Sequence, residues 1–311
     1  MATRLKVLLT GGRGLVGRAI ADHPLAKSLA LHAPTRAELD LRDKPQVHAY
    51  LSDLRPDVIV HAAGRVGGIS ANIADPYGFL LENLEVGTNV ISCAAEQGIE
   101  RLLNLASSCV YPKDCDGLLR EEMILHGPLE PTNEGYALAK IAALRLCQFS
   151  AIRNPGLRYK TFIPCNLFGP HDKFELAYAH LVPAIIHKIH RATTEGAGTV
   201  QIWGDGTARR EFMYVGDLAE AVLRAVHDFD AVPDLMNIGI GRDHTVLEYY
   251  GAAAEAIGWT GEFVFDLDKP AGMRRKVVDV ERQTGWGFEP RTSLADGIRA
   301  TYDFFLRHYA S

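Results

Sequence analysis

The feature that most constrains the fold is a regular alternation of short apolar runs with longer helical windows. The apolar runs predict strands at 5–10, 29–33, 56–63, 101–107 and 158–166. The windows between them predict helices at 14–24, 44–53, 76–97 and 135–153. Apolar strands separated by helices form a parallel sheet that helices cover on both faces. We therefore predict an α/β fold built on a doubly wound parallel sheet with right-handed crossovers.

A glycine-rich turn follows the first predicted strand. In LLTGGRGLVGRAI the three glycines have the spacing GxxGxxG, and a helical window comes next. Glycines let such a turn fold tightly, and they let its backbone approach a pyrophosphate at the N-terminal amides of the helix. A glycine triplet alone is a weak signal, but this one opens an alternating strand–helix chain. We predict a Rossmann-type dinucleotide site formed by Gly11, Arg13, Gly14, Leu15, Val16 and Gly17, with Ala63 after the third strand.

The alternation gives way to a different pattern after residue 167. Residues 167–180 are loop-like, and short strands follow among further helices. Helices are predicted at 180–192, 245–258 and 293–309. We predict a larger Rossmann-type domain of residues 1–166 plus about 211–238, which binds NADP, and a smaller α/β domain of residues 167–210 plus about 239–311, which binds the substrate.

Composition excludes several classes of protein. The net charge of −5 gives no reason to expect a nucleic acid or an anionic membrane as partner. No apolar run approaches the ~20 residues that span a bilayer, and the apolar N-terminus enters a turn where a signal peptide would have a cleavage site. The five cysteines form no CxxC pair and no metal-like spacing. We expect reduced thiols, no metal and a cytoplasmic location.

Two arginines bear on the choice of dinucleotide. An NAD site usually carries an acid at the end of the second strand, where it binds the ribose 2′-OH. Here that strand, LALHAPTR, ends without one, and Arg36 lies just beyond it. Together with Arg13, it could clamp a 2′-phosphate through charge-assisted hydrogen bonds. We therefore favour NADP(H) as the cofactor; the alternative is that both arginines are solvated surface residues. Asp40 is a candidate to bind the edge of the adenine ring.

A tyrosine and a lysine four residues apart predict proton transfer beside the dinucleotide. Tyr136 and Lys140, in NEGYALAK, share one face of a predicted helix. A neighbouring ammonium favours the phenolate, so the expected pKa of this tyrosine is below its usual value near 10. Such a pair can donate or accept a proton at a carbonyl while a hydride moves. Ser107, which ends the strand RLLNLAS, completes the set.

These motifs resemble the extended short-chain dehydrogenase/reductase family. The resemblance is closest to its GDP-L-fucose synthase branch and covers nearly the whole chain. The stretches that carry it are RVGGISAN, SSCVYPK, LEPTNEGYALAKIA, NLFGPHD, HLVPA, WGDGTARREFMYVGD and KPAGMRRKVVDV. The resemblance implies a bifunctional enzyme that acts on GDP-4-keto-6-deoxy-mannose. It first epimerises C3 and C5 and then reduces C4 with NADPH.

The same resemblance gives Cys109 and His180 a role. Protons at C3 and C5 of a 4-keto sugar are acidic, and inversion needs a base on one face and an acid on the other. The resemblance makes a Cys109 thiolate the base and His180 the acid, with the thiol pKa lowered by cationic neighbours. Ser107, Tyr136 and Lys140 then serve the reduction. Without the resemblance, a cysteine after a strand is usually a small buried apolar residue.

The resemblance also implies the residues that bind the GDP-sugar. Arg210 matches the diphosphate-binding arginine of that family, while Lys188 stands where the family tends to carry an arginine. Trp203 is a candidate for the nucleotide, or alternatively a core residue. The complete substrate-binding set is Ser108, Asn166, His180, Lys188, Trp203, Arg210 and Lys269. Asn166 is also assigned to the cofactor, where it would approach the carboxamide, as is Lys140.

Two departures leave alternatives open. Arg65 replaces an expected lysine, and residues before His180 are mostly apolar (KFELAYAH), where the family has small polar ones. A GDP-linked dideoxyhexose or heptose would suit the same machinery, as would a 4-reductase or 4-epimerase without 3,5-epimerisation. A non-catalytic nucleotide sensor is disfavoured, because it needs no proton donor. The resemblance also implies a homodimer formed through the helices at 76–97 and 135–153.

Overall fold

The computed structural model describes residues 4–115, 117–176, 179–268 and 275–310. Its centre is a six-stranded, fully parallel sheet with the order β10-β5-β4-β3-β1-β2. The strands are β1 (Lys6–Thr10), β2 (Ala30–His32), β3 (Val58–His61), β4 (Arg101–Leu105), β5 (Arg158–Pro164) and β10 (Leu235–Ile238). This arrangement confirms the predicted Rossmann-type α/β fold.

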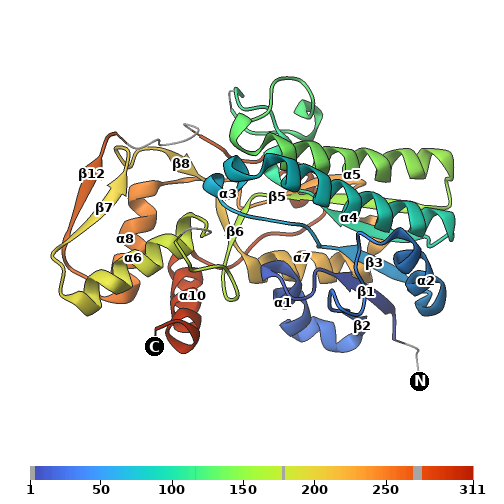
Figure 1. The fold of residues 1–311 in the computed structure, drawn as a ribbon, viewed down its shortest axis with the longest axis horizontal. Coiled ribbons are helices and arrows are strands. Elements are labelled where there is room, and N and C mark those ends of the chain that lie inside the picture. The colour runs from blue at the N-terminus through green and yellow to red at the C-terminus, as the bar shows by residue number, and fades with distance from the viewer. Residues whose placement is uncertain (1–3, 116, 177–178, 269–274, 311) are drawn as a thin grey trace.

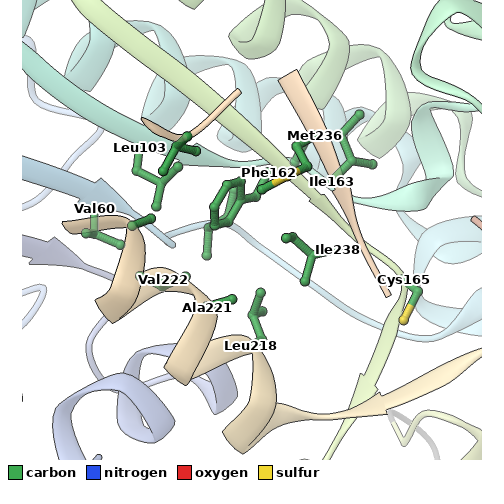
Figure 2. Close-up of a cluster of buried hydrophobic side chains, with 14 of the residues drawn as sticks. Val60, Leu103, Phe162, Ile163, Cys165, Leu218, Ala221, Val222, Met236 and Ile238 are labelled. Atoms are coloured by element: carbon green, nitrogen blue, oxygen red, sulfur yellow. The ribbon is translucent and has the colours of Figure 1, made fainter. Parts of the chain in front are cut away.

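The sheet is buried on both faces because its strands are apolar at successive positions. Val7 and Leu9 of β1 belong to one core, while Leu8 between them belongs to the other. Figure 2 shows the first core, where side chains of β3, β4, β5 and β10 meet those of α7 (Val215–His227). Side chains alternate across a strand, so a continuous apolar run fills both cores.

Helices cover the two faces in the order that right-handed crossovers require. On one side lie α1 (Leu15–Asp22) and α7; on the other lie α4 (Pro76–Glu96) and α5 (Glu134–Arg153), which pack side by side (Figure 1). Val47 and Leu51 of α2 (Lys44–Leu54) join Val90 and Ile91 of α4 in the second core. Asp43 and Asp75 cap α2 and α4 by accepting from first-turn amides, and a proline follows each cap.

A smaller body stands at one end of the sheet (Figure 1). Its helices are α6 (Leu181–Glu195), α8 (Val246–Ile257) and α10 (Leu294–His308). Three two-stranded pairs accompany them: β6 (Asn166–Phe168) with β9 (Phe212–Tyr214), β7 (Thr199–Trp203) with β12 (Glu262–Asp266), and β8 (Arg209–Arg210) with β11 (His244–Thr245). Side chains of all three helices share a third core. The remaining short helices are α3 (Ile69–Ala74) and α9 (Glu281–Gly285).

The chain returns twice to the large sheet after residue 210. β10 pairs with β5, and Val278, Trp286 and Phe288 join the core under α7. Where the two domains divide stays a prediction. None of the helices in the described part of the chain combines the length and the apolar character needed to cross a membrane.

The order of the strands places a ligand site. The chain leaves β1 toward β2 on one side and continues to β3 on the other, so the order reverses between β1 and β3. Ligands of open α/β sheets bind outside the carboxyl ends of the strands at such a point. The glycine turn follows β1, Ala63 follows β3, and Ser107 follows β4 at this same edge.

Candidate functional site

The glycine turn is built so that only glycine fits two of its positions. Gly11 has φ +73°, and a methyl group added there would lie 2.8 Å from backbone atoms of Ala62 and Ala63. A methyl group on Gly17 would lie 2.1 Å from the Gly11 oxygen. Helix α1 is therefore pressed against the end of β1. The Gly14 amide donates to the Gly11 carbonyl (3.0 Å) and closes the turn.

The start of α1 fits a pyrophosphate. Its N-cap is Gly14, which has no side chain to bond the first-turn amides. Leu15 and Val16 stand in that first turn and are partly exposed. Free amides and the positive end of a helix dipole form an anion site. The turn, with Ala63 against Gly11, therefore has the form that a dinucleotide requires.

Arg13 in the turn and Arg36 after β2 are the arginines predicted to bind a 2′-phosphate, and Asp40 lies close to Arg36. Arg36 is 65% exposed at its side chain, and its Nε lies 3.8 Å from Asp40 Oδ2. Asp40 is held more closely by Arg42 (2.7 Å), and hydrogen bonds from Arg42 lower the pKa of Asp40 to about 2. Arg13 is exposed; hydrogen bonds from Thr35 lower the pKa of Glu38, and the charge of Arg13 adds to this. Arg36 and Arg13 can thus reach a phosphate, whereas Asp40 is engaged with Arg42.

The reduction residues come together at the end of β4. Lys140 is buried, and its Nζ donates to the Leu105 carbonyl (3.0 Å) and lies 5.8 Å from the Tyr136 ring centroid. Ser107 Oγ accepts from the Cys109 amide (3.4 Å). A methyl group at Gly64 would lie 3.4 Å from Lys140 Nζ, so the loop after β3 also borders this ammonium.

The expected pKa of Tyr136 is wrong for the protein alone. Burial raises it well above the usual value, and the nearby Cys109 raises it further. Burial also lowers the pKa of Lys140 to about 8, and Cys109 partly offsets this. Desolvation disfavours every charged form, and here it outweighs the attraction between phenolate and ammonium. Tyr136 is therefore a neutral phenol that can give a proton.

Burial reverses the expected charges of Cys109 and His180 as well. It raises the pKa of the Cys109 thiol, while Lys276, Ser107 and Lys140 act in the opposite direction. It lowers the pKa of His180, and Lys173 lowers it further. At neutral pH the prevailing pair in the protein alone is thus a thiol and a neutral imidazole, and the predicted thiolate and imidazolium form a minor state.

Lys276 is a site residue that the sequence argument missed. It interacts electrostatically with Cys109 and Arg210, so it is a second lysine, besides Lys140, whose charge acts on the thiol. The backbone of the two residues after Lys276 is held by hydrogen bonds. The Leu119 amide donates to the Val277 carbonyl (2.9 Å), and the Val278 amide donates to Glu211 Oε2 (2.7 Å). The stretch KPAGMRRKVVDV pointed to the right segment without singling out this lysine.

His61 is a second residue that the sequence did not reveal. It ends β3 fully buried, and its Nδ1 pairs with Thr10 Oγ1 (2.8 Å). Burial, followed by the charge of Lys140, lowers the pKa of His61 to about 3. It therefore stays neutral beside the Lys140 ammonium. The motif HAAG after the third strand was its only sequence signal.

The predicted substrate residues divide into two groups. Lys188 Nζ lies 5.5 Å from the Trp203 ring centroid and 3.3 Å from Tyr250 Oη. Trp203 is 51% exposed, so it is not a core residue. Arg210 lies instead near Lys276, on the Cys109 side. The structure thus brings Lys188 and Trp203 together on the smaller body.

The other predicted substrate residues have varied surroundings. Ser108 is buried in the turn that carries Cys109, and Asn166 Nδ2 donates to the Glu211 carbonyl (3.0 Å). His180 is the N-cap residue of α6. Lys269 lies outside the described residues. That Cys109 and His180 face one sugar stays a prediction. Among the described residues, no group of three or more His, Cys, Asp and Glu side chains could hold a metal ion.

Known proteins resemble this chain along nearly its whole length. Residues 7–239 match the model of the NAD dependent epimerase/dehydratase family. The chain is 48% identical to GDP-L-fucose synthase of Azorhizobium caulinodans, covering 97% of this chain and 96% of the relative. It is 47% identical to GDP-L-colitose synthase of Yersinia pseudotuberculosis, covering 97% and 98%. Among solved structures, an NADP-bound GDP-mannoheptose C4 reductase from Campylobacter jejuni superposes with a TM-score of 0.88 at 26% identity, covering 98% and 99%.

Proposed function

Because this chain belongs to the NAD dependent epimerase/dehydratase family, in the branch of the extended short-chain dehydrogenases/reductases that holds the GDP-L-fucose synthases, we propose that it converts GDP-4-keto-6-deoxy-mannose to GDP-L-fucose. The reaction is a 3,5-epimerisation followed by a 4-reduction with NADPH. The observation that carries the proposal is a thiol, Cys109, next to the Tyr136 and Lys140 of a reductase. A plain reductase has no use for that thiol.

The dinucleotide belongs in the turn after β1. Gly11 and Gly17 let the turn and α1 pack closely against the ends of β1 and β3, the first amides of α1 hold the pyrophosphate, and Arg13 and Arg36 bind a 2′-phosphate. When bound, NADPH supplies the hydride that reaches C4. NADP(H) is thus proposed over NAD(H) on the exposed Arg36 and on the absence of an acid at the end of β2.

Reduction at C4 needs a proton at the carbonyl oxygen, and Tyr136 is suited to give it. Burial keeps its phenol protonated near neutral pH. Ser107 ends the neighbouring strand and can donate a second hydrogen bond to the same oxygen. Lys140 remains largely cationic below pH 8, and it helps the phenol to lose its proton as charge develops.

Epimerisation uses Cys109 and His180 on opposite faces of the sugar. The base removes a proton from carbon next to the carbonyl, Ser107 and Tyr136 stabilise the enolate oxygen, and the acid returns a proton to the other face. Only the minor thiolate–imidazolium state is active in this assignment. Lys276 and Lys140 enlarge that state by favouring the thiolate.

The GDP part lies between the two substrate groups of the site. Arg210 and Lys276 are cations that suit a diphosphate. Trp203 offers an exposed aromatic face next to Lys188, which suits a purine ring. The sugar then lies toward Cys109.

A related sugar is the second candidate. Identity to a GDP-L-colitose synthase (47%) equals, within one point, that to a GDP-L-fucose synthase (48%). Leu176, which is 45% exposed, adds apolar surface just before His180. Such a segment suits a GDP-linked dideoxyhexose, whose ring carries fewer hydroxyl groups. GDP-linked heptoses are a further alternative of the same kind, since they are also GDP-linked sugars.

A product assay decides among these sugars. The purified protein is incubated with NADPH and each GDP-4-keto sugar in turn, and products are identified by NMR. Formation of GDP-L-fucose at the highest kcat/KM supports the first candidate. Faster turnover of a dideoxy or heptose substrate would replace it with the second. Absence of NADPH oxidation with all of them would contradict the proposed enzyme.

We place the enzyme in the cytoplasm as a homodimer. Cys93, Cys109, Cys147 and Cys165 are buried thiols, as expected in a reducing compartment. Helices α4 and α5 expose apolar side chains, and Phe149 (60%) and Ile152 (75%) are prominent among them. A second copy that covers these helices would form a four-helix bundle.

A further inference from the structure

Phe174, six residues before His180, is anchored on the C-terminal helix and on α6. Phe174 packs its ring 5.1 Å from Phe305 and 4.9 Å from Tyr309, measured between ring centroids. The carbonyl of Phe174 pairs with His187 Nδ1 of α6 (2.7 Å). The backbone at residue 174 is therefore held by α6 and α10. The backbone from which the Lys173 side chain extends, one residue earlier, is thus held close to α6 and α10.

Lys173 reaches from this segment to the large sheet. Its Nζ donates to the carbonyl of Val66 (3.1 Å), 107 positions away in the chain. Val66 lies in the loop that follows β3, where the dinucleotide is proposed to bind. Lys173 thus joins a segment of the smaller body to a loop of the larger one.

The receiving loop is itself rigid. Asn83, buried on α4, accepts from the Arg65 amide (2.9 Å) and donates to the Arg65 carbonyl (3.1 Å). Arg65 is further tied to Asp75 (2.7 Å) and Glu82 (3.0 Å). One residue earlier, Gly64 borders Lys140. A short, well-fixed path therefore leads from Lys140 to the Val66 carbonyl and on to Lys173.

Lys173 also acts on His180. Burial lowers the pKa of the His180 imidazole, and the charge of Lys173 lowers it further. The acids beside it in the segment, Asp172 and Glu175, act instead on Tyr309. A neighbouring cation destabilises an imidazolium and makes it a stronger acid.

We propose that Lys173 is a positioning residue for the epimerisation: it ties the backbone at Phe174, six residues before His180, to the loop after β3 and so sets the place of that histidine. The inference rests on the proposed function for its catalytic consequence. A lysine suits this task because it supplies both a donor for Val66 and a positive charge for His180. Arginine would keep both, and methionine would keep only the length of the side chain.

The test compares Lys173→Met and Lys173→Arg with Lys27→Met, which removes an exposed lysine elsewhere. The first readout is the pH titration of the His180 Cε1–H resonance, assigned with His180→Asn. In Lys173→Met the His180 pKa should rise, while in Lys173→Arg and Lys27→Met it should stay at the wild-type value. This readout needs neither substrate nor turnover, so it remains valid if the proposed reaction is wrong.

The second readout is deuterium exchange into GDP-4-keto-6-deoxy-mannose in D2O. In Lys173→Met the higher His180 pKa enlarges the imidazolium state, but the loss of the bond that places the histidine should outweigh this. Exchange should therefore slow about fivefold, the effect of one net hydrogen bond, and recover in Lys173→Arg. The KM for NADPH should not change. An unchanged His180 titration in Lys173→Met, or equal exchange in Lys173→Met and wild type, would overturn the inference. Absence of exchange in the wild type would instead contradict the proposed function.

Discussion

Replacing Glu211 by alanine should lower the free energy of unfolding by about 2–4 kcal/mol. Glu211 is fully buried, and its carboxylate accepts from the amides of Ile240 (2.7 Å), Gly241 (2.9 Å) and Val278 (2.7 Å). A buried donor left without a partner costs about 1–3 kcal/mol. Alanine leaves one such donor at Val278 and two part-buried donors, whose loss costs less, at Ile240 and Gly241. Glu211→Gln keeps an acceptor for two of them, so its loss should be about 1–3 kcal/mol.

Urea unfolding measures both losses, with Glu255→Ala on the exposed face of α8 as the control. The control should change the free energy of unfolding by less than about 0.5 kcal/mol. Glu211→Gln should also slow deuterium exchange into the substrate, because the Val278 amide that it releases holds the segment of Lys276. A loss below about 1 kcal/mol in Glu211→Ala would refute the assignment of three unsatisfied donors.

Four further predictions concern the chemistry and the assembly. Tyr136→Phe should lower the rate of NADPH oxidation by about 10²–10⁴-fold and slow deuterium exchange much less, since the reduction needs the proton of Tyr136 while the enolate oxygen keeps its hydrogen bond from Ser107; equal loss of both would contradict this division. Arg36→Ala should raise the KM for NADPH about tenfold and leave that for NADH unchanged, which steady-state kinetics with both cofactors will show. Exchange should be constant between about pH 6.5 and 8, because the thiolate gained as pH rises offsets the imidazolium lost, and it should fall only slightly above pH 8, where Lys140 ceases to favour the thiolate. Reduction should fall steeply above pH 8 as Lys140 loses its proton; exchange that follows reduction would contradict this. Phe149→Asp with Ile152→Asp should yield a monomer by light scattering if α4 and α5 form the dimer contact, and an unchanged mass would exclude that contact.

The sequence predicted the sheet well because its signals are local. Each apolar run and each helical window carries its own periodicity, and the observed ends of β1 and α4 differ from the predicted ones by a residue or so. The glycine turn was equally readable, since the crowding at Gly11 and Gly17 lies within one strand–turn–helix unit. The family was also identified correctly from motifs of this local kind.

Features that depend on contacts between distant parts of the chain could not be predicted, because the signals in the sequence are local. Lys276 enters the site because the backbone around Val278 pairs with that of Leu119, far earlier in the chain. The structural role of Glu211 depends on three amides that lie 29 to 67 positions away in the chain and donate to its carboxylate. The pKa directions of Tyr136 and Cys109 were wrong because burial, which residue spacing does not show, outweighs the neighbouring cations.

The most direct test is solvent exchange with Cys109→Ser. GDP-4-keto-6-deoxy-mannose is incubated in D2O without NADPH, and deuterium at C3 and C5 is followed by NMR. The wild type should incorporate deuterium at both carbons, and Cys109→Ser should incorporate none above the uncatalysed rate while still binding NADPH. Exchange in Cys109→Ser at the wild-type rate would show that the thiol is not the base.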